Sequence, residues 1–445
     1  MQLVLSGRNV CIVGKSGVGK TRTLHEVVAR RGGCGRHVAV LAFCGSAAHA
    51  AGGVTIHNFL DLGTCDSRAS VEAARVRLQK VARSALAFKP RAGDKPWQVE
   101  RRERVGRAAA LKTLVVDELS MTPPWALDLL DAYMRAARNS TRPFGGVQLV
   151  MVGDPCQLPP VELPGEAATY VFDSPIWERA DFAYAVLNTV QRQSDSLFVR
   201  LLDAVRAGQT RPFLSWEPEL REALLARVEA TVLDSEGAAF DVVRLAATNA
   251  EVDRANVAGL AALPGEARAY PLRVTPAAAA GTDLGNARPV ELKPRARVML
   301  THNLDVARGL FNGAVGVVES APEDGYALVR FRHGTERVSR MEVERESSAS
   351  GGGSPCTVNF LPLRVAYGVT LHRCQGCTLD AAEVSLGVKM QAGAAYTGLS
   401  RVRDLGCLRV RLPTGHDPAT VLAAAFRTNE KALAFLERVD KKTKY

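Results

Sequence analysis

Three short segments of this chain carry side chains suited to phosphate chemistry. Residues 14–21 read GKSGVGKT, residues 114–121 read LVVDELSM and residues 153–160 read GDPCQLPP. The first segment follows an apolar run and matches G-x-x-x-x-G-K-[ST], in which small glycines let backbone N–H groups approach phosphates closely. It predicts a nucleoside-triphosphate site in which Lys20 reaches the β- and γ-phosphates and the Thr21 hydroxyl binds Mg²⁺. The predicted nucleotide contacts are Gly14, Lys15, Ser16, Gly17, Val18, Gly19, Lys20, Thr21 and Arg22.

Two acids and a glutamine complete the predicted catalytic set. Asp117 and Glu118 close an apolar strand, so we expect their carboxylates at the same sheet edge as the phosphate loop. Asp117 would hold Mg²⁺ and Glu118 would orient the attacking water, whereas the alternative is an acidic strand end that caps the next helix. Gln157 lies on a turn stiffened by prolines, where its amide can contact the γ-phosphate or its attacking water. The alternative for Gln157 is that it satisfies loop backbone.

Composition limits the classes of partner and compartment. The chain has 445 residues, with 57 basic and 46 acidic side chains, and its net charge of +11 suits a polyanion such as nucleic acid. No apolar run reaches the ~18 residues needed to span a bilayer, so no membrane partner is expected. Nine scattered cysteines favour an intracellular, reducing compartment over a disulfide framework. Cys374 and Cys377 form a C-x-x-C pair, but no second pair follows at the spacing of a zinc site.

The elements that position the three segments alternate between strands and helices as far as residue 165, which predicts a parallel α/β sheet. Apolar strands are expected at residues 10–13, 38–43, 114–116 and 147–152, with a helix at 20–31. Residues 66–112 are rich in Arg, Lys and Ala and predict an inserted helical or hairpin subdomain.

A second α/β pattern is predicted after a linker at residues 161–184. It has strands at 185–187 and 242–246 and a helix at 195–207. Three short alternating runs at 314–319, 326–332 and 336–344 predict a small β-barrel inserted into this second domain. The α/β pattern resumes at residue 361 and ends in an amphipathic helix near 417–438.

The order of these segments resembles superfamily 1 helicases, in the 1B branch that contains the Pif-type and RecD-type DNA motors. The resemblance covers nearly the whole chain. Beyond the three segments above, it rests on FCGSAAHAAGGVTIHNF (43–59), VQRQSD (190–195), NLDVARGLFNGAVGVV (303–318), LPLRVAYGVTLHRCQGCTLD (361–380) and YTGLSRVRDL (396–405). It implies an α/β fold of two RecA-like P-loop domains, with ATP and Mg²⁺ in the cleft between them and single-stranded DNA across both.

The resemblance also implies domain bounds. RecA-like domain 1 would comprise residues 1–65 and 111–165, with a 1B wedge subdomain inserted at 66–110. RecA-like domain 2 would comprise residues 166–310 and 359–445, with an SH3-like 2B insertion at 311–358.

The resemblance assigns roles to further residues. Arg192 and Arg401 would be arginine fingers that offset charge on the γ-phosphate, although each alone would more often be a surface arginine. Gln375 and Gly376 would lie on a loop that couples ATP to DNA. The implied DNA contacts are Thr55, His57, Asn249, Asn312, Thr370 and His372. A lone histidine is, however, more often a core or capping residue.

Two departures from the family pattern concern the base of the nucleotide. The glutamine segment that reads adenine is missing or replaced in the 13 residues before Gly14, so the sequence does not fix the selectivity for adenine over other bases. Gln191 stands where an aromatic residue often precedes the Arg-Gln pair, which removes a stacking partner. Arg22 could stack on the base instead.

Three functions compete at this point. The leading expectation is an ATP-dependent DNA helicase that moves on single-stranded DNA and at single-strand/double-strand junctions as a monomeric motor, with the 5′-to-3′ direction implied by resemblance. A second is a nucleic-acid-stimulated ATPase that remodels RNA or protein–DNA complexes without unwinding, since nothing in the sequence excludes RNA. A third is a nucleotide-gated binding module, which would have no use for a water-orienting acid and two arginine fingers.

Overall fold

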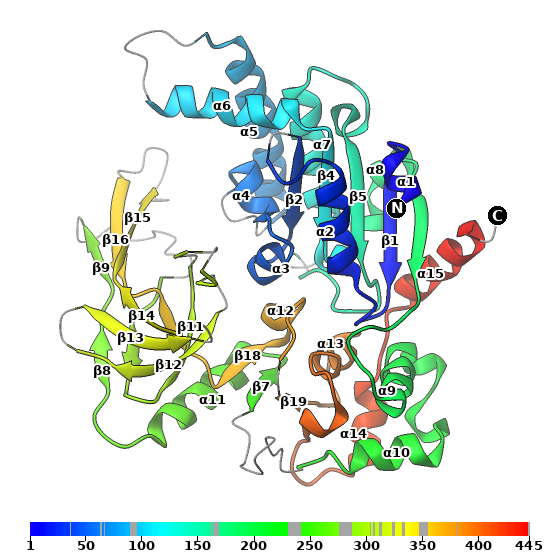
Figure 1. Ribbon diagram of the computed structural model, residues 1–445, viewed down its shortest axis with the longest axis vertical. Coiled ribbons are helices and arrows are strands. Elements are labelled where there is room, and N and C mark those ends of the chain that lie inside the picture. The colour runs from blue at the N-terminus through cyan, green and yellow to red at the C-terminus, as the bar shows by residue number, and fades with distance from the viewer. Residues whose placement is uncertain are drawn as a thin grey trace. The chain divides into compact units, whose positions relative to one another are not determined.

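The computed structural model describes the chain except residues 36, 63–64, 66, 90–95, 162, 164–168, 230–241, 276–286, 303, 306–307, 311–313, 323–324, 332–333, 347–354, 380 and 444–445. The chain divides into two compact units (Figure 1). Unit 1 comprises Met1–Gly237, Cys374–Asp380 and Leu386–Tyr445, and unit 2 comprises Ala238–Arg373 and Ala381–Ser385.

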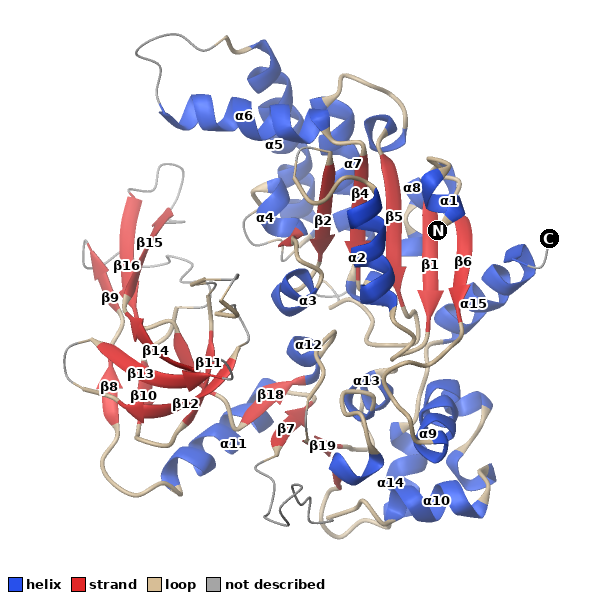
Figure 2. Cartoon of the chain, in the orientation of Figure 1, coloured by secondary structure: helices blue, strands red, loops and turns tan. Residues whose placement is uncertain are grey.

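A six-stranded sheet forms the centre of unit 1 (Figure 2). Its strand order is β3-β2-β4-β5-β1-β6, and the neighbouring strands pair in parallel. The strands are β1 (Val10–Gly14), β2 (Val38–Ala42), β3 (Val54–Thr55), β4 (Thr113–Asp117), β5 (Gln148–Gly153) and β6 (Ala183–Leu187). Every residue of β1, β4 and β5 is buried, as in a parallel sheet covered on both faces. The predicted parallel α/β sheet is confirmed.

Strand β6 corrects one prediction. The sequence pattern assigns residues 185–187 to the second α/β domain, but Ala183–Leu187 pairs in parallel with Val10–Gly14 of β1. That assignment is wrong because an apolar strand pattern indicates burial and does not specify which strand lies beside it. The remaining domain bounds stay predictions.

The described part of unit 1 also contains helices. They are α1 (Gln2–Leu5), α2 (Lys20–Arg30), α3 (Gly45–Ala50), α4 (Ile56–Leu60), α5 (Arg68–Ala87), α6 (Pro96–Ala110), α7 (Pro124–Ala137), α8 (Pro175–Arg179), α9 (Ser196–Ala207), α10 (Pro218–Leu225), α13 (Ala394–Leu399), α14 (Pro418–Ala425) and α15 (Glu430–Thr443). Six 3₁₀ turns lie between them: η1 (Leu119–Met121), η2 (Pro143–Gly146), η3 (Val171–Asp173), η4 (Gly208–Thr210), η5 (Phe213–Ser215) and η6 (Leu405–Cys407). Strand β20 (Leu408–Arg411) also belongs to this unit.

The segment predicted as a helical or hairpin insertion is helical where it is described. Helices α5 and α6 lie side by side against α7 (Figure 1). Helix α5 begins at a reciprocal cap in which Ser67 and Ser70 each accept the backbone N–H of the other. Leu78 and Ala82 of α5 are buried in the same hydrophobic core as α7. Helices α5 and α7 therefore belong to the same hydrophobic core, which also includes buried residues of the six-stranded sheet.

Helix α15 closes another side of that core. The Phe435 ring stacks on the Phe172 ring with centroids 4.2 Å apart. It also packs edge-on against the Trp177 ring, with centroids 5.8 Å apart. Helix α15 also contacts β6. A late segment of the chain thus completes the apolar packing around an early sheet.

Unit 2 combines a small α/β part with antiparallel sheets. Strand β7 (Val243–Ala246) pairs in parallel with β18 (Gly368–Thr370) and β19 (Ala382–Ser385), and α11 (Asn249–Ala261) packs on β7 and β18. The other elements are β8 (Arg268–Tyr270), β9 (Arg273–Thr275), β10 (Val290–Leu292), β11 (Arg297–Leu300), β12 (Val315–Ser320), β13 (Tyr326–Phe331), β14 (Gly334–Ser339), β15 (Met341–Glu346), β16 (Pro355–Phe360) and β17 (Leu363–Val365). Helix α12 (Leu371–Cys374) begins in unit 2, and its last residue is assigned to unit 1.

The first two predicted alternating runs correspond to strands β12 and β13, and the third, 336–344, covers parts of both β14 and β15. Strands β12, β13 and β14 are neighbours. They join β11 and β17 in one sheet of order β14-β13-β12-β11-β17, while β15, β16 and β9 form a second sheet. Alternate residues of β12 and β13, such as Val318 and Val329, enter a common core. The SH3-like closure of this insertion stays a prediction.

None of the helices in the described ranges combines the length and apolar character needed to cross a bilayer.

Candidate nucleotide site

The loop between β1 and α2 has the backbone of a phosphate-binding turn. Gly17 and Gly19 have φ angles of 82° and 83°, in the left-handed region that favours glycine. Gly19 immediately precedes α2, so the positive end of the helix dipole faces the loop. Free N–H groups at this helix start and a positive dipole end together favour an anion.

Lys20 is the first residue of α2 and is nearly buried. Its Nζ donates to the carbonyl oxygens of Gly14 at 2.9 Å and Lys15 at 3.0 Å. Burial lowers the pKa of Lys20, while the carboxylates of Asp154 and Glu118 oppose that shift. The loop therefore wraps around a cation that is held close to acidic side chains.

The side chains of the other predicted loop contacts differ in pairing and in burial. The Nζ of Lys15 pairs with Asp203 of α9 at 2.6 Å, so its side chain is used within the protein. Val18 is buried, Thr21 lies on the first turn of α2 and is partly buried, and Arg22 is exposed.

Asp117 ends β4, and Glu118 follows it with φ 53° and ψ 57°. This left-handed conformation is uncommon for a residue with a Cβ and costs about 1–2 kcal/mol. Asp117 Oδ1 accepts the N–H of Glu118 at 2.9 Å. Burial, followed by the charge of Glu118, raises the pKa of Asp117 to about 7. Two buried acids held side by side favour the approach of a cation.

Three glutamines of this unit, Gln157, Gln193 and Gln375, have a buried side-chain oxygen without a partner among the described residues. Gln375 Nε2 donates to Glu118 Oε2 and to Ser120 Oγ, both at 3.0 Å. The side-chain Oε1 atoms of Gln375 and Gln157 are buried without a partner among the described residues. A buried acceptor without a partner costs about 1–3 kcal/mol, so each oxygen is suited to accept from a ligand or a reacting water. A Cβ on the neighbouring Gly376 would lie 3.3 Å from Glu118 Oε1.

Arg192 and Arg401 converge on one residue of the phosphate loop. Arg192 Nη1 lies 3.4 Å from Ser16 Oγ, and Arg401 Nη2 lies 3.3 Å from the same atom. Arg401 is only 1% exposed and also donates to the Thr397 carbonyl at 2.7 Å. Burial, followed by the charge of Arg401, lowers the pKa of Arg192 to about 10. Because these acceptors are neutral oxygens, the contacts leave two positive charges directed at the loop.

The chain is similar to known proteins over most of its length. Residues 1–220 match a family model described as an AAA domain. ATP-dependent DNA helicase PIF1 of Danio rerio is 33% identical over 449 residues, which cover 99% of this chain and 63% of the relative. Over nearly its whole length the chain is similar to Pif-type helicases of superfamily 1.

Solved Pif-type structures share the fold. Pif1 helicase from Candida albicans matches with a TM-score of 0.76 and 24% identity, covering 99% of this chain and 97% of that one. Pif1 helicase from Bacteroides, in complex with ADP-AlF3 and ssDNA, matches with a TM-score of 0.73 and 24% identity, covering 99% and 96%. The chain therefore has the fold of two RecA-like domains. It spans 63% of the length of the Danio rerio relative.

In unit 1, two of the predicted DNA contacts already have roles in packing. Thr55 Oγ1 caps α4 by accepting the N–H of Asn58 at 3.1 Å. The ring of His57 lies 5.1 Å from that of Phe43 and 5.9 Å from that of Trp125, and burial lowers its pKa. These contacts explain both residue types without requiring a bound strand.

The other predicted DNA contacts belong to unit 2. Asn249 is exposed at the start of α11, Thr370 ends β18, and His372 follows on α12. His372 Nε2 is buried without a partner among the described residues, and burial lowers the pKa of the ring. A neutral imidazole with an unused nitrogen can bond a sugar or phosphate oxygen if that nitrogen carries the proton. Asn312 lies outside the described residues.

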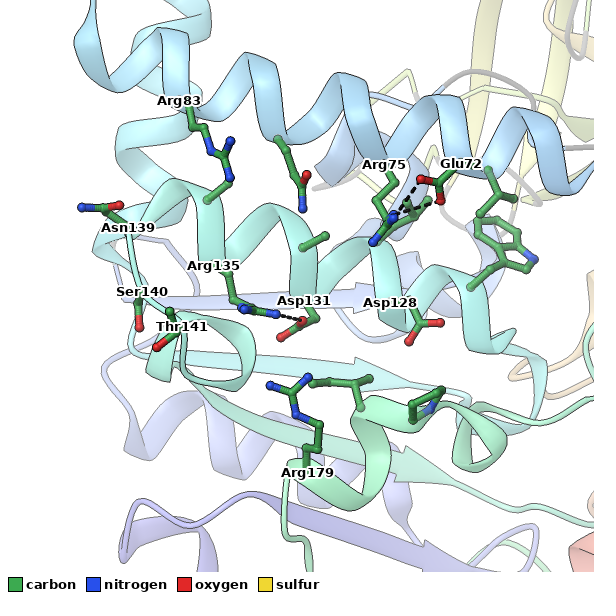
Figure 3. Close-up of a pocket in the computed structure, with 18 residues that line it drawn as sticks. Glu72, Arg75, Arg83, Asp128, Asp131, Arg135, Asn139, Ser140, Thr141 and Arg179 are labelled. Atoms are coloured by element: carbon green, nitrogen blue, oxygen red, sulfur yellow. Dashed lines mark hydrogen bonds and ion pairs between the residues drawn. The ribbon is translucent and has the colours of Figure 1, made fainter.

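A pocket of about 550 Å³ lies between α5, α7 and α8, away from the phosphate loop (Figure 3). Its charged side chains are of both signs. Arg75 pairs with Glu72 at 2.8 Å, and Arg135 lies 3.5 Å from Asp131. Its lining has four arginines against three carboxylates, contains no glycine and shares no residue with the loop at 14–22, so it lacks the backbone of a phosphate-binding turn. The candidate nucleotide site is the loop at residues 14–22.

Sequence reasoning missed part of the site. Tyr396, Asp154 and Arg206 form a buried hydrogen-bonded chain that reaches Ser16. Asp154 directly follows the last residue of β5 and lies three residues before Gln157. This position at a strand end was the signal that could have identified it as a site residue. Nothing in the spacing of Tyr396 or Arg206 predicts their partner.

Proposed function

We propose that this chain is an ATP-dependent DNA helicase that uses hydrolysis of Mg²⁺-ATP to move along single-stranded DNA and separate duplex strands. One observation carries the proposal: Arg192 and Arg401 converge on Ser16 of the loop that also buries Lys20. Three cations preorganised at a single loop are suited to stabilise the charge that spreads over the γ-phosphate oxygens during its transfer to water.

The comparisons support the same activity. The Danio rerio relative carries the name ATP-dependent DNA helicase PIF1, and the Bacteroides neighbour binds ADP-AlF3 and ssDNA. A binding module without turnover would gain nothing from a strained acid beside a glutamine amide.

Mg²⁺ fits the donor set at the ends of β4 and the phosphate loop. Hard oxygen ligands are what this ion prefers, and Thr21 supplies a hydroxyl while Asp117 supplies a carboxylate. Burial, followed by the charge of Glu118, raises the pKa of Asp117, and a bound cation would oppose this shift by favouring the carboxylate. When bound, Mg²⁺ would neutralise charge on the β- and γ-phosphate oxygens.

In the proposed reaction, Glu118 accepts a proton from the attacking water and Gln157 orients that water through its unpaired Oε1. Gln375 holds the Glu118 carboxylate in place through its Nε2. Lys20 binds the β- and γ-phosphates, and Arg192 and Arg401 exchange the Ser16 hydroxyl for γ-phosphate oxygens. Both guanidiniums then act where negative charge develops.

For the track, we propose that Thr55, His57, Asn249, Asn312, Thr370 and His372 contact the DNA backbone. Residues 66–110 act as the strand-separating wedge, and residues 311–358 form the SH3-like insertion. The basic balance of the chain strengthens binding to DNA through release of counterions.

Unwinding of tailed duplexes tests this function. Duplexes with either a 5′ or a 3′ single-stranded tail are incubated with Mg²⁺ and ATP, and Lys20→Ala serves as the control. We expect opening of the 5′-tailed duplex alone, and no opening by Lys20→Ala. If DNA stimulates ATP hydrolysis but neither duplex opens, the chain is a translocase and not a helicase. If a matched RNA stimulates hydrolysis more strongly than DNA does, RNA is the track.

A further inference from the structure

Tyr396 lies at the crossing of two loops in unit 1. Its hydroxyl accepts the backbone N–H of Ser16 at 2.7 Å and donates to Asp154 Oδ2 at 3.0 Å. All three residues are buried. One phenol therefore joins the phosphate loop after β1 to the loop after β5, across 380 and 242 residues of sequence respectively.

The far end of this connection is fixed by an ion pair. Asp154 is completely buried, and Arg206 of α9 reaches its Oδ1 at 2.9 Å through Nη2 and its Oδ2 at 3.1 Å through Nε. Such a two-point contact fixes the plane of the carboxylate as well as its position. Asp154 is therefore a rigid anchor for the Tyr396 hydroxyl.

The helix that carries Tyr396 also holds the loop of Gln157. Thr397 Oγ1 accepts the N–H of Leu158 at 3.1 Å. Gly393, with φ of 79°, caps the start of α13, and its backbone lies directly against the Gln157 carbonyl, where any Cβ would collide. Both contacts are made to the peptide group that follows Gln157, so the backbone beside this side chain depends on the position of α13.

We propose that Tyr396 is a positioning residue that sets the Gln157 amide relative to the phosphate loop, by tying Ser16 and Asp154 to α13. This inference rests on the proposed function, because it assigns Gln157 a part in hydrolysis. A nucleotide that shifts the phosphate loop would shift the Gln157 loop with it, since buried hydrogen bonds transmit small displacements between packed elements.

Removal of one hydroxyl isolates this role. Tyr396→Phe keeps the buried ring, and leaves the Ser16 N–H and one Asp154 lone pair without their partner. Tyr133→Phe is the matched control, because Tyr133 is buried in the α7 core of the same unit. We expect Tyr396→Phe to lower kcat for ATP hydrolysis about tenfold and to change KM less than about threefold, with kcat of Tyr133→Phe within about twofold of the native value.

A double-mutant cycle distinguishes positioning from general loosening. We expect Tyr396→Phe to lower kcat about tenfold in the native background and less than about twofold in the Gln157→Ala background, because the residue on which it acts is then gone. Equal losses in both backgrounds would overturn the proposal. Should Tyr396→Phe melt below the assay temperature, Thr397→Val replaces it in the cycle, since it removes the acceptor of the Leu158 N–H.

Amide hydrogen exchange tests the connection without turnover. We expect ADP to slow exchange of residues 154–160 in the native chain and in Tyr133→Phe, and to leave it unchanged in Tyr396→Phe although ADP still binds. An ADP response that persists in Tyr396→Phe, or is missing from the native chain, would refute the proposal. If this response appears as expected but the native chain does not hydrolyse ATP, the proposed function fails and the connection stands.

Discussion

The Gln375 amide donates to the Glu118 carboxylate at 3.0 Å, across 257 residues of sequence. Glu118 is the residue with the strained left-handed backbone after β4, and Gln375 belongs to the short segment 374–380 that joins unit 1. A strained residue that is also oriented by a distant side chain fits a catalytic role, because the surrounding structure must maintain the strain.

Glu118→Gln removes the proton acceptor and keeps the shape of the side chain. We expect kcat for ATP hydrolysis to fall about 10²–10⁴-fold, the range of general base catalysis, while ATP and single-stranded DNA still bind. Steady-state hydrolysis with fluorescence titration of each ligand measures both quantities. Glu103→Gln, on exposed α6, is the control and should retain native turnover. Near-native hydrolysis by Glu118→Gln would exclude Glu118 as the base.

Arg401→Ala removes one of the two guanidiniums at Ser16. By analogy with arginine fingers of other nucleotide hydrolases, we expect a loss of about 10³-fold or more in kcat, with little change in affinity for single-stranded DNA. Arg403→Ala, two residues away and exposed, is the matched control. A variant that loses DNA binding but keeps DNA-independent hydrolysis would refute the finger assignment.

Two arginines on α9 provide a paired test of stability. Arg206→Met leaves Asp154 buried without its guanidinium, so we expect the free energy of unfolding to fall by about 3–5 kcal/mol. Arg200 pairs with Glu219 at the surface, and Arg200→Met should cost about 0–1 kcal/mol. Urea denaturation measures both variants. Similar losses in the two would show that the buried pair contributes no more than the exposed one.

The pKa of Asp117 predicts a dependence of stability on pH in Mg²⁺-free buffer. Its folded value of about 7 lies above the ordinary value of about 3.9 for an unfolded aspartate. Between these two pH values the folded state retains a proton that the unfolded state has released, so stability falls as pH rises and then levels off above 7. Asp117→Asn should lack this slope in denaturation curves taken from pH 4 to 8. An identical slope in both proteins would assign the proton to another group.

The strands that carry the site were predictable from sequence for a physical reason. Residues 10–13 and 114–116 are continuous apolar runs because both faces of the central sheet are covered, and each run is followed by residues suited to phosphate chemistry. The glycine spacing of the loop then indicated the left-handed turns at Gly17 and Gly19. The order of residues was sufficient to predict these strands and turns, because each depends on the burial or the backbone angles of neighbouring residues.

Long-range pairing was not predictable in the same way. The neighbour of β6, the partner of Tyr396 and the ion pair of Lys15 with Asp203 each depend on contacts across more than 150 residues. Hydrogen bonds between single side chains leave no periodic trace in a sequence. The roles of Arg192 and Arg401 came from family resemblance, and the structure adds the atom on which they converge.

The packing of α15 has a consequence for how the chain reaches its native state during synthesis. Phe435 completes the aromatic cluster beside β6, so the first sheet cannot close its core until residues 430–443 have left the ribosome. Contacts of such long sequence separation slow folding, because the entropy of closing a long loop must be overcome first. The nascent N-terminal half would therefore present apolar surface for much of translation, and it is a candidate substrate for chaperones that protect growing chains.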